Sequence, residues 1–336
     1  MFKKINSKFL LGLLMVTGLS IGFFSCGDNE ALTTQEDEIA ISLFKQELQY
    51  NTQRFVAQDE GEGTYSITGE QGTRVKIKNA LVNSRGERVR GEVEIELIEI
   101  YSVADMILNR KQTLADYDGQ PEILESGGEI FIQVYQDGEK LSADGNGDMR
   151  IYLPTENTGG AREGMELFYG EEVEDQVIWK PTGKPVKVVE NQSRNAEEYL
   201  VIIQDILGWI NVDIIFGAGG EEVECVEVVI NCPELCGGEP GNTVVAINVP
   251  NVNSAFELTY DPDTGSYKIC GGAEGPLPLG GLTVNLIIVI ECPDGTVMVA
   301  IITVTINVGY HLEIVNCSDF VNMSDPGQFA QALQQL

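Results

Sequence analysis

The stretch Glu92-Val-Glu-Ile-Glu-Leu97 decides the fold class, because glutamate alternates strictly with large aliphatic residues. Successive side chains of a β-strand point to opposite faces, so this period of two predicts a strand with one buried and one charged face. Arg74-Val-Lys-Ile-Lys78 repeats the pattern with a basic outer face. Opposite charges stabilise cross-strand pairs. We therefore predict that 74–78 and 92–97 pair in antiparallel fashion, with Asn83-Ser-Arg-Gly86 in the connection.

After Leu97 the apolar phase shifts to Ile98 and Ile100. We interpret this shift as a β-bulge, which inserts one extra residue into a strand.

Further strand patterns surround this pair, and helical periods are absent between residues 53 and 186. The predicted strands are 130–134, 149–153, 166–169, 243–249, 256–260, 267–270, 282–291 and 296–308. Asp261-Pro-Asp-Thr-Gly265 and Cys292-Pro-Asp-Gly295 have the composition of hairpin turns. Each arm of the last hairpin is short and interrupted by polar groups, which favours a buried core hairpin over a membrane span. The fold class is therefore all-β, with β-sandwich-like modules.

The chain divides into four predicted parts. Residues 1–25 are a signal peptide and 26–52 are a tether with a short helix, in which Thr34-Gln-Glu-Asp37 forms a capping box. A β-sandwich module follows at 53–186 and a cysteine-containing β module at 187–336. The polar, proline-containing stretch 181–196 is interpreted as the connection between the modules. A second short helix is predicted at the C-terminus, with Asp325 as its cap, Pro326 at its first position and an apolar face of Phe329, Leu333 and Leu336.

The charge balance is strongly acidic, with 52 Asp and Glu residues against 21 Lys and Arg residues in 336. An acidic surface repels the phosphates of nucleic acids, so nucleic acid is excluded as a partner.

The N-terminal segment has the organisation of an export signal. Lys3, Lys4 and Lys8 precede an apolar stretch from Phe9 to Phe24. That stretch is shorter than the roughly 20 residues that a membrane-spanning helix needs. An uncleaved anchor and an ordinary signal that is cleaved nearby are the alternatives.

Phe23-Phe24-Ser25-Cys26 resembles a bacterial lipoprotein lipobox, in which a small residue precedes the cysteine that becomes lipidated. The resemblance implies that Cys26 is the mature N-terminus and carries acyl chains. Asp28 and Glu30 follow directly, and such acidic residues resemble the export signals of Bacteroidota surface lipoproteins.

Residues 53–215 resemble the N-terminal β-sandwich of uncharacterised Bacteroidota cell-surface lipoproteins. The segments that carry the resemblance are Gly72–Ile77, Gly86–Ile95, Ser126–Gly128, Met165–Gly170 and Leu207–Asp213. It implies a fold and a compartment, and it brings no catalytic residues.

Six cysteines lie beyond Cys26, all in the second module: Cys225, Cys232, Cys236, Cys270, Cys292 and Cys317. An even number of cysteines behind an export signal predicts up to three disulfides, whose pairing the sequence leaves open. The alternative is free buried thiols. Zinc is disfavoured, because Cys232 and Cys236 are separated by three residues, whereas zinc and redox motifs typically separate their cysteines by about two.

The metal candidate is Asp144-Gly-Asn-Gly-Asp148, where Asp144, Asn146 and Asp148 resemble the opening ligands of a calcium loop. The pattern departs from that loop at its sixth and twelfth positions, which are Met149 and Thr155. A tight hairpin connection is the favoured interpretation. Ca²⁺, bound weakly at this loop, is the only cofactor that the sequence suggests.

No catalytic residue is predicted. The single histidine, His311, lies in a strand-like stretch without a nucleophile motif, so a surface histidine is expected. Trp179 and Trp209 are expected in the core. A carboxylate pair of the kind that hydrolases use could be formed from the many acids, but the sequence singles out no two of them.

The expected function is that of a lipid-anchored, non-enzymatic structural or binding module of the cell envelope, at the outer membrane and facing either the periplasm or the exterior. Its partners would be the membrane, through the lipid, and an unidentified protein or glycan. The alternatives are a surface hydrolase or glycan-processing accessory with a carboxylate site, and a calcium-stabilised adhesin.

Overall fold

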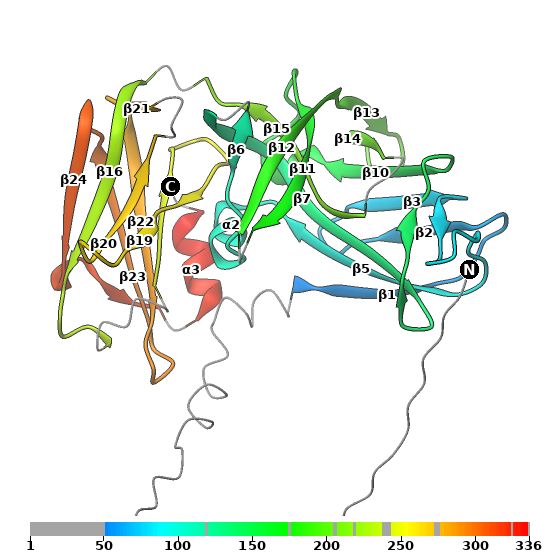
Figure 1. Cartoon of the computed structure of the whole chain (residues 1–336), viewed down its shortest axis with the longest axis horizontal. Coiled ribbons are helices and arrows are strands. Elements are labelled where there is room, and N and C mark those ends of the chain that lie inside the picture. The colour runs from blue at the N-terminus through cyan, green and yellow to red at the C-terminus, as the bar shows by residue number, and fades with distance from the viewer. Residues whose placement is uncertain are drawn as a thin grey trace, which may run out of the picture. The chain divides into compact units, whose positions relative to one another are not determined.

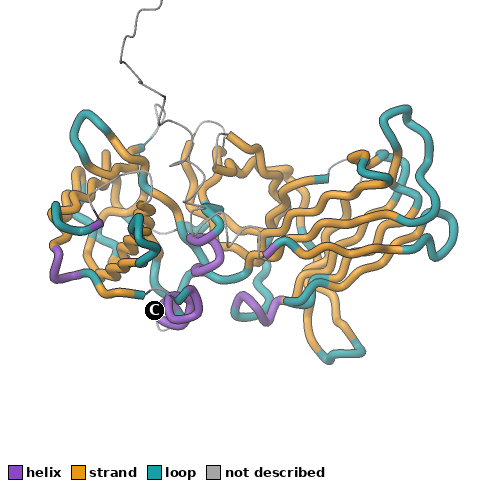
Figure 2. The backbone as a smooth tube through the Cα atoms, turned by 90° about the horizontal axis from the view of Figure 1, so that it is seen from below, coloured by secondary structure: helices purple, strands orange, loops and turns teal. Residues whose placement is uncertain are grey.

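Strands dominate the computed structural model, with 59% of residues in strands and 8% in helices, and the expected all-β class is confirmed (Figure 2). It describes residues 51–117, 120–173, 176–203, 207–217, 220–236, 243–271, 276–323 and 325–334. The predicted signal peptide and tether helix lie outside these residues. Within the described ranges, no helix is both long enough and apolar enough to cross a membrane.

Two sheets in residues 53–215 form what we call the first sandwich (Figure 1). Its larger sheet has the order β1 (Gln53–Ala57), β5 (Val93–Ile100), β7 (Gln120–Gln136), β15 (Gly208–Ile215), β11 (Glu166–Val173), β12 (Gln176–Pro185) and β6 (Leu114–Tyr117), and β8 (Glu139–Lys140) pairs with β7. The smaller sheet has the order β13 (Lys187–Asn191), β14 (Ala196–Ile203), β10 (Asp148–Pro154), β3 (Arg74–Lys78) and β2 (Thr64–Thr68). A short pair joins β4 (Leu81–Val82) to β9 (Ser142–Ala143).

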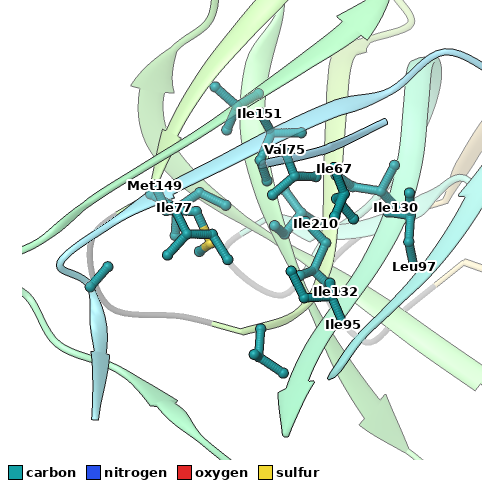
Figure 3. Packing of buried hydrophobic residues seen from close by; sticks show 14 of the residues in the cluster. Ile67, Val75, Ile77, Ile95, Leu97, Ile130, Ile132, Met149, Ile151 and Ile210 are labelled. Atoms are coloured by element: carbon teal, nitrogen blue, oxygen red, sulfur yellow. The ribbon is translucent and has the colours of Figure 1, made fainter. Parts of the chain in front are cut away.

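The predicted pairing of 74–78 with 92–97 is wrong. β3 pairs with β2 and β10, whereas β5 pairs with β1 and β7, so the two strands lie in different sheets. Their apolar faces meet across the core instead, with Val75 and Ile77 from one sheet and Ile95 and Leu97 from the other in a single cluster (Figure 3). The charged faces point away from each other and find other partners, such as Arg54 for Glu96.

The predicted bulge after Leu97 is also wrong, because β5 pairs with β7 in unbroken register from Glu94 to Ile100. The shift in apolar phase marks a second buried face. Leu97 packs inside the first sandwich, while Ile98 and Ile100 pack on the opposite side of the sheet in a different apolar cluster. Both faces of β5 are buried from this point on, so the alternation ends without a change in backbone geometry.

Residues 221–322 form a second pair of sheets, the second sandwich. One sheet has the order β19 (Thr259–Asp261), β20 (Ser266–Cys270), β16 (Glu221–Asn231) and β21 (Leu277–Gly280), and β24 (Gly309–Asn316) pairs with β16 in parallel. The other has the order β18 (Phe256–Glu257), β17 (Thr243–Asn248), β22 (Thr283–Glu291), β23 (Val297–Thr305) and β25 (Val321–Asn322). Both predicted hairpins are confirmed, since β19 pairs with β20 and β22 with β23 in antiparallel register. β22 is buried along almost its whole length, as the core-hairpin interpretation requires.

The connection between the modules is not at 181–196. Those residues lie largely in the end of β12, in β13 and at the start of β14, and all three strands belong to the first sandwich. The chain changes sheets between Ile215 and Glu221. Polar composition marked the edge strand β13, which among the described residues pairs only with β14 and exposes most of its side chains.

The structure adds one helix that no periodicity predicted, α2 (Val103–Leu108). Its six residues are too few to establish a helical repeat, but a capping box formed by Ser102 and Asp105 fixes its start. The C-terminal helix is confirmed as α3 (Pro326–Leu333), with Phe329 and Leu333 buried. Leu336, which was predicted on the same face, lies outside the described residues. Short 3₁₀ segments occur at Thr155–Thr158 and Cys317–Asp319.

The two sandwiches share an interior. Ile98 and Ile100 of β5 lie in one cluster with Ile287 and Val289 of β22 and with Phe329 of α3. Polar contacts reinforce this packing: the Nδ2 group of Asn253 donates to the carbonyls of Tyr101 (3.0 Å) and Ser126 (2.8 Å). Thr113 and Ser254 join their hydroxyls at 2.7 Å, and Arg110 pairs with Glu257 at 3.1 Å. The part of the larger sheet's outer face that carries Ile98 and Ile100 is therefore covered by the second sandwich.

Candidate functional site

Of the sequence-predicted site residues, Cys26 lies outside the described residues, and the six remaining cysteines form three disulfides. The pairs are Cys225–Cys270, Cys232–Cys317 and Cys236–Cys292. The disulfide prediction is thus confirmed, and the structure supplies the pairing that the sequence left open.

Each disulfide joins elements that the strand pairing already brings close. Cys225 and Cys270 are directly opposite each other on β16 and β20. Cys232 and Cys317 follow the paired ends of β16 and β24, where Asn231 lies opposite Asn316. The remaining bridge runs from the segment after β16 to the turn between β22 and β23, so it ties one sheet of the second sandwich to the other.

The loop with Asp144, Asn146 and Asp148 has the geometry of a tight turn whose acids already have partners. A carboxylate oxygen of Asp144 accepts hydrogen bonds from the backbone (2.9 Å) and side-chain (2.7 Å) amides of Asn146, and its carboxylate also pairs with Arg88. Asp148 pairs with Arg150 at 2.7 Å. These contacts lower the pKa of Asp144, with the backbone hydrogen bond from Asn146 as the main cause. Among the described residues, no group of three or more metal-binding side chains is found.

We expect that adding a chelator leaves the melting temperature of the purified protein unchanged, because arginines neutralise the loop acids without a metal ion. Differential scanning calorimetry with EDTA, compared with added Ca²⁺, measures this. A rise in melting temperature with Ca²⁺ that Asp144→Asn abolishes would restore the calcium-loop interpretation.

His311 is buried, with 3% of its surface exposed, so the expected surface position is wrong. Its neighbours on β24 face outward, and the ring fills the inner side of that strand. Nδ1 accepts a hydrogen bond from the backbone N–H of Asn307 at 3.1 Å. The sequence showed only an alternating strand and could not tell which of its faces points inward.

Both tryptophans are buried, as expected. Nε1 of Trp179 donates to the carbonyl of Gln112 (2.6 Å), and Nε1 of Trp209 donates to a carboxylate oxygen of Glu172 (2.8 Å). They pack between the sandwiches and do not form a surface for stacking sugars.

A group of buried acidic side chains was missed by sequence reasoning. Glu129 on β7 and Asp213 on β15 are completely buried, and Glu125 is nearly so. We call these three residues the buried acidic cluster. The only signal in the sequence is a charged residue within an apolar strand, as in Trp209-Ile-Asn-Val-Asp-Ile-Ile215.

The cluster lies where β7 and β15 pair irregularly. Asn211 is opposite Glu129, Asp213 is opposite Ser126, and the register shifts between them. Nδ2 of Asn211 donates to Oδ2 of Asp213 at 2.5 Å, and the Ser126 hydroxyl donates to Oδ1 of Asn211 at 3.0 Å. Neither carboxylate oxygen of Glu129 has a hydrogen-bond partner among the described residues, and the same holds for Oδ1 of Asp213.

A glycine beside the cluster permits this close packing. Gly128 has φ of +131°, and a Cβ atom there would lie 2.5 Å from Cε1 of Tyr101. Any other residue would combine backbone strain with a collision in the core. Glycine at position 128 is therefore required by the packing of Tyr101 against the strand that carries Glu129.

Burial controls the protonation of these acids. It raises the pKa of Glu129 well above its usual value of 4.5, and the nearby Asp213 raises it further. Burial also raises the pKa of Asp213 well above 3.8. Burial raises the pKa of Glu125 too, although the Arg162 guanidinium, 2.7 Å from its carboxylate, partly offsets this. Lys111 is buried nearby with Nζ 4.9 Å from the Trp209 ring centre, and burial lowers its pKa.

The carboxyl groups of the cluster have raised pKa values, as catalytic carboxyl pairs often do, but a substrate cannot reach them. Two cavities are lined entirely by described residues. One of about 220 Å³ lies between the start of α2 and the end of α3, and one of about 280 Å³ lies in the hairpin joining β13 to β14. No residue of the cluster lines either cavity. Because Glu129 and Asp213 expose no surface, a substrate cannot contact them in this conformation. The cluster is thus suited to keeping its carboxyl groups protonated inside the fold.

The surface of the second sandwich carries an exposed apolar strand. Tyr310, Leu312 and Ile314 all point outward from β24 and are about half exposed. We call these three side chains the β24 stripe. Exposed apolar groups arranged in a row are typical of binding surfaces.

No protein-family model matches the chain, and no curated protein matches it. Function is therefore inferred from the chain's own residues.

Proposed function

We propose that this chain is a lipid-anchored protein of the cell envelope, held at the outer membrane through Cys26, and that it acts as a non-enzymatic structural or binding module. The observation that carries this proposal is the set of three disulfides, which join all six cysteines beyond residue 26. Disulfides form and persist outside the reducing cytosol. A chain that uses them must be exported, which agrees with the lysines and apolar stretch before Cys26.

Lipidation of Cys26 accounts for the lone cysteine at the end of that apolar stretch. Each CH₂ group of an acyl chain buried in a bilayer contributes about 0.8 kcal/mol, and one chain alone binds only marginally. The resemblance to a lipobox implies several chains, which would hold the protein on the membrane. The segment after Cys26 would then act as the tether between the membrane and β1.

The shape of the interior supports a structural or binding role over a catalytic one. The carboxylates with the most strongly raised pKa values are enclosed between the sandwiches, whereas the β24 stripe is available to a partner. The negative net charge of −31 favours uncharged or cationic partners.

We expect radiolabelled palmitate to enter the wild-type chain in growing bacteria and not Cys26→Ser, because the acyl chains need this thiol. Immunoprecipitation followed by autoradiography measures the label. The matched control is Ser25→Ala, which keeps a small residue before the cysteine and should be labelled like the wild type. Equal labelling of wild type and Cys26→Ser would overturn the lipid assignment.

Membrane fractionation completes this test. The wild type should sediment with the outer membrane, while Cys26→Ser should be released in a soluble form with its three disulfides intact on a non-reducing gel. Cytosolic protein with six free thiols would instead contradict export itself.

A further inference from the structure

β24 is an open edge of its sheet. It pairs in parallel with β16 from Gly309 to Asn316, and within the described part of the chain no strand pairs with its other side. Figure 1 shows it as the outermost strand of the sheet. Such an edge presents backbone N–H and C=O groups that can extend the sheet with another chain.

The outer face of this edge is apolar. Tyr310, Leu312 and Ile314 are 48%, 47% and 50% exposed, and no charged residue of β24 lies on their face. Proteins usually protect an edge strand with lysine, proline or a bulge. The stretch Gly309-Tyr-His-Leu-Glu-Ile-Val-Asn316 contains no lysine and no proline.

The inner face of the same edge has an unsatisfied donor. Because Nδ1 of His311 accepts the N–H of Asn307, a ring proton lies on Nε2. That nitrogen is buried and makes no hydrogen bond, although Oε2 of Glu313 on the same strand lies 3.5 Å away. Leaving a buried donor without an acceptor is unfavourable.

The order of these residues is self-complementary. In an antiparallel pair of identical strands centred on Leu312, each leucine faces its own counterpart and Tyr310 faces Ile314 of the other copy. His311 then faces Glu313 of the other copy, on the inner side. Apolar groups meet apolar groups, and the imidazole N–H meets a carboxylate.

We propose that two copies of this chain associate through antiparallel pairing of β24 with β24, centred on Leu312, so that one sheet of the second sandwich continues across a two-fold axis. Charge complementarity selects this register. Centring on His311 or Glu313 would place identical titratable groups opposite each other, and like groups in that position are destabilising. If the two-fold axis passed between two residues instead of through one, the β24 stripe of one copy would lie on the same face as the buried side chains of the other copy.

A second copy fits this edge better than an arbitrary strand, because it supplies a carboxylate at both histidines and apolar groups at all three positions of the β24 stripe. The net charge of −31 on each copy opposes association at long range. Salt screens such repulsion within about 8 Å at physiological ionic strength, so the dimer should strengthen as salt is added.

Cysteine cross-linking tests the register directly. The full chain carrying Leu312→Cys, expressed in bacteria and oxidised in isolated membranes, should run as a disulfide-linked dimer on a non-reducing gel. Ile314→Cys is the matched control, because the two copies of that residue would be about four residues apart along the strands, roughly 13 Å. A disulfide needs Cα atoms within about 7 Å. The unaltered chain gives the background from Cys26.

A second pair of variants keeps the test independent of Leu312. Co-expressed Tyr310→Cys and Ile314→Cys chains should cross-link to each other, while neither should cross-link to itself. Val188→Cys, an exposed position in the first sandwich, should give only background. Absence of the mixed dimer, self-linking of Ile314→Cys that equals that of Leu312→Cys, or cross-linking of Leu312→Cys only to a different protein would each overturn the proposal.

Discussion

Replacing Cys232 and Cys317 by alanine should lower the free energy of unfolding by about 4 kcal/mol, because the bridge closes a loop of 85 residues. A cross-link of this span removes many conformations from the unfolded chain. It also holds the ends of β16 and β24 together, and β24 has no other strand neighbour in the described residues. Denaturation in guanidinium chloride, followed by fluorescence of the two buried tryptophans, measures the change.

The matched control for this bridge is Cys225→Ala with Cys270→Ala, which opens a loop of 45 residues. Halving the loop length changes the closure free energy by only about 0.6 kcal/mol, so this variant should be destabilised slightly less. A loss below about 1 kcal/mol for the 85-residue bridge would show that the unfolded chain is not constrained by it.

Glu129→Gln should make the protein more stable at pH 8 and less sensitive to pH. Glutamine has the shape of a protonated glutamate, so it fills the same site between the sandwiches without carrying a charge. The wild-type chain must keep a buried carboxyl protonated, or bury its charge, at any pH above the usual range for glutamate.

The sign of this effect follows from the raised pKa. Below about pH 4.5 Glu129 is protonated in both the folded and the unfolded chain. As the pH rises above that value, the unfolded chain releases the proton while the folded chain retains it, so the free energy of unfolding falls. The fall reaches up to about 1.4 kcal/mol per pH unit and ends at the folded pKa. Asp213 lowers the free energy of unfolding in the same way as the pH rises, starting near pH 3.8.

Urea denaturation of the wild type and Glu129→Gln at several pH values between 5 and 9 tests this. The difference in unfolding free energy between the two proteins should grow with pH. Glu60→Gln, at an exposed position, is the control and should parallel the wild type. If the difference for Glu129→Gln is the same at pH 5 and pH 9, Glu129 is already ionised in the folded protein and the proposed protonation is wrong.

The sequence by itself determined those features of the fold that depend only on residues close together in the chain. Alternation with a period of two is a local property of the chain, and it located strands such as 74–78 and 93–97 and both hairpins of the second sandwich. Turn composition did the same for the segments at 261–265 and 292–295. The even number of cysteines predicted disulfides, although it carried no information on their pairing.

Only the tertiary structure decided which faces meet. Cross-strand charge favoured pairing β3 with β5, but burying two apolar faces against each other across a sandwich is worth about 25 cal/mol for each Å² removed from water, which outweighs a few surface ion pairs. The same long-range packing covers Ile98 and Ile100, turns His311 inward and encloses Glu129 with Asp213. These outcomes depend on contacts between residues far apart in the chain, which a local pattern does not encode.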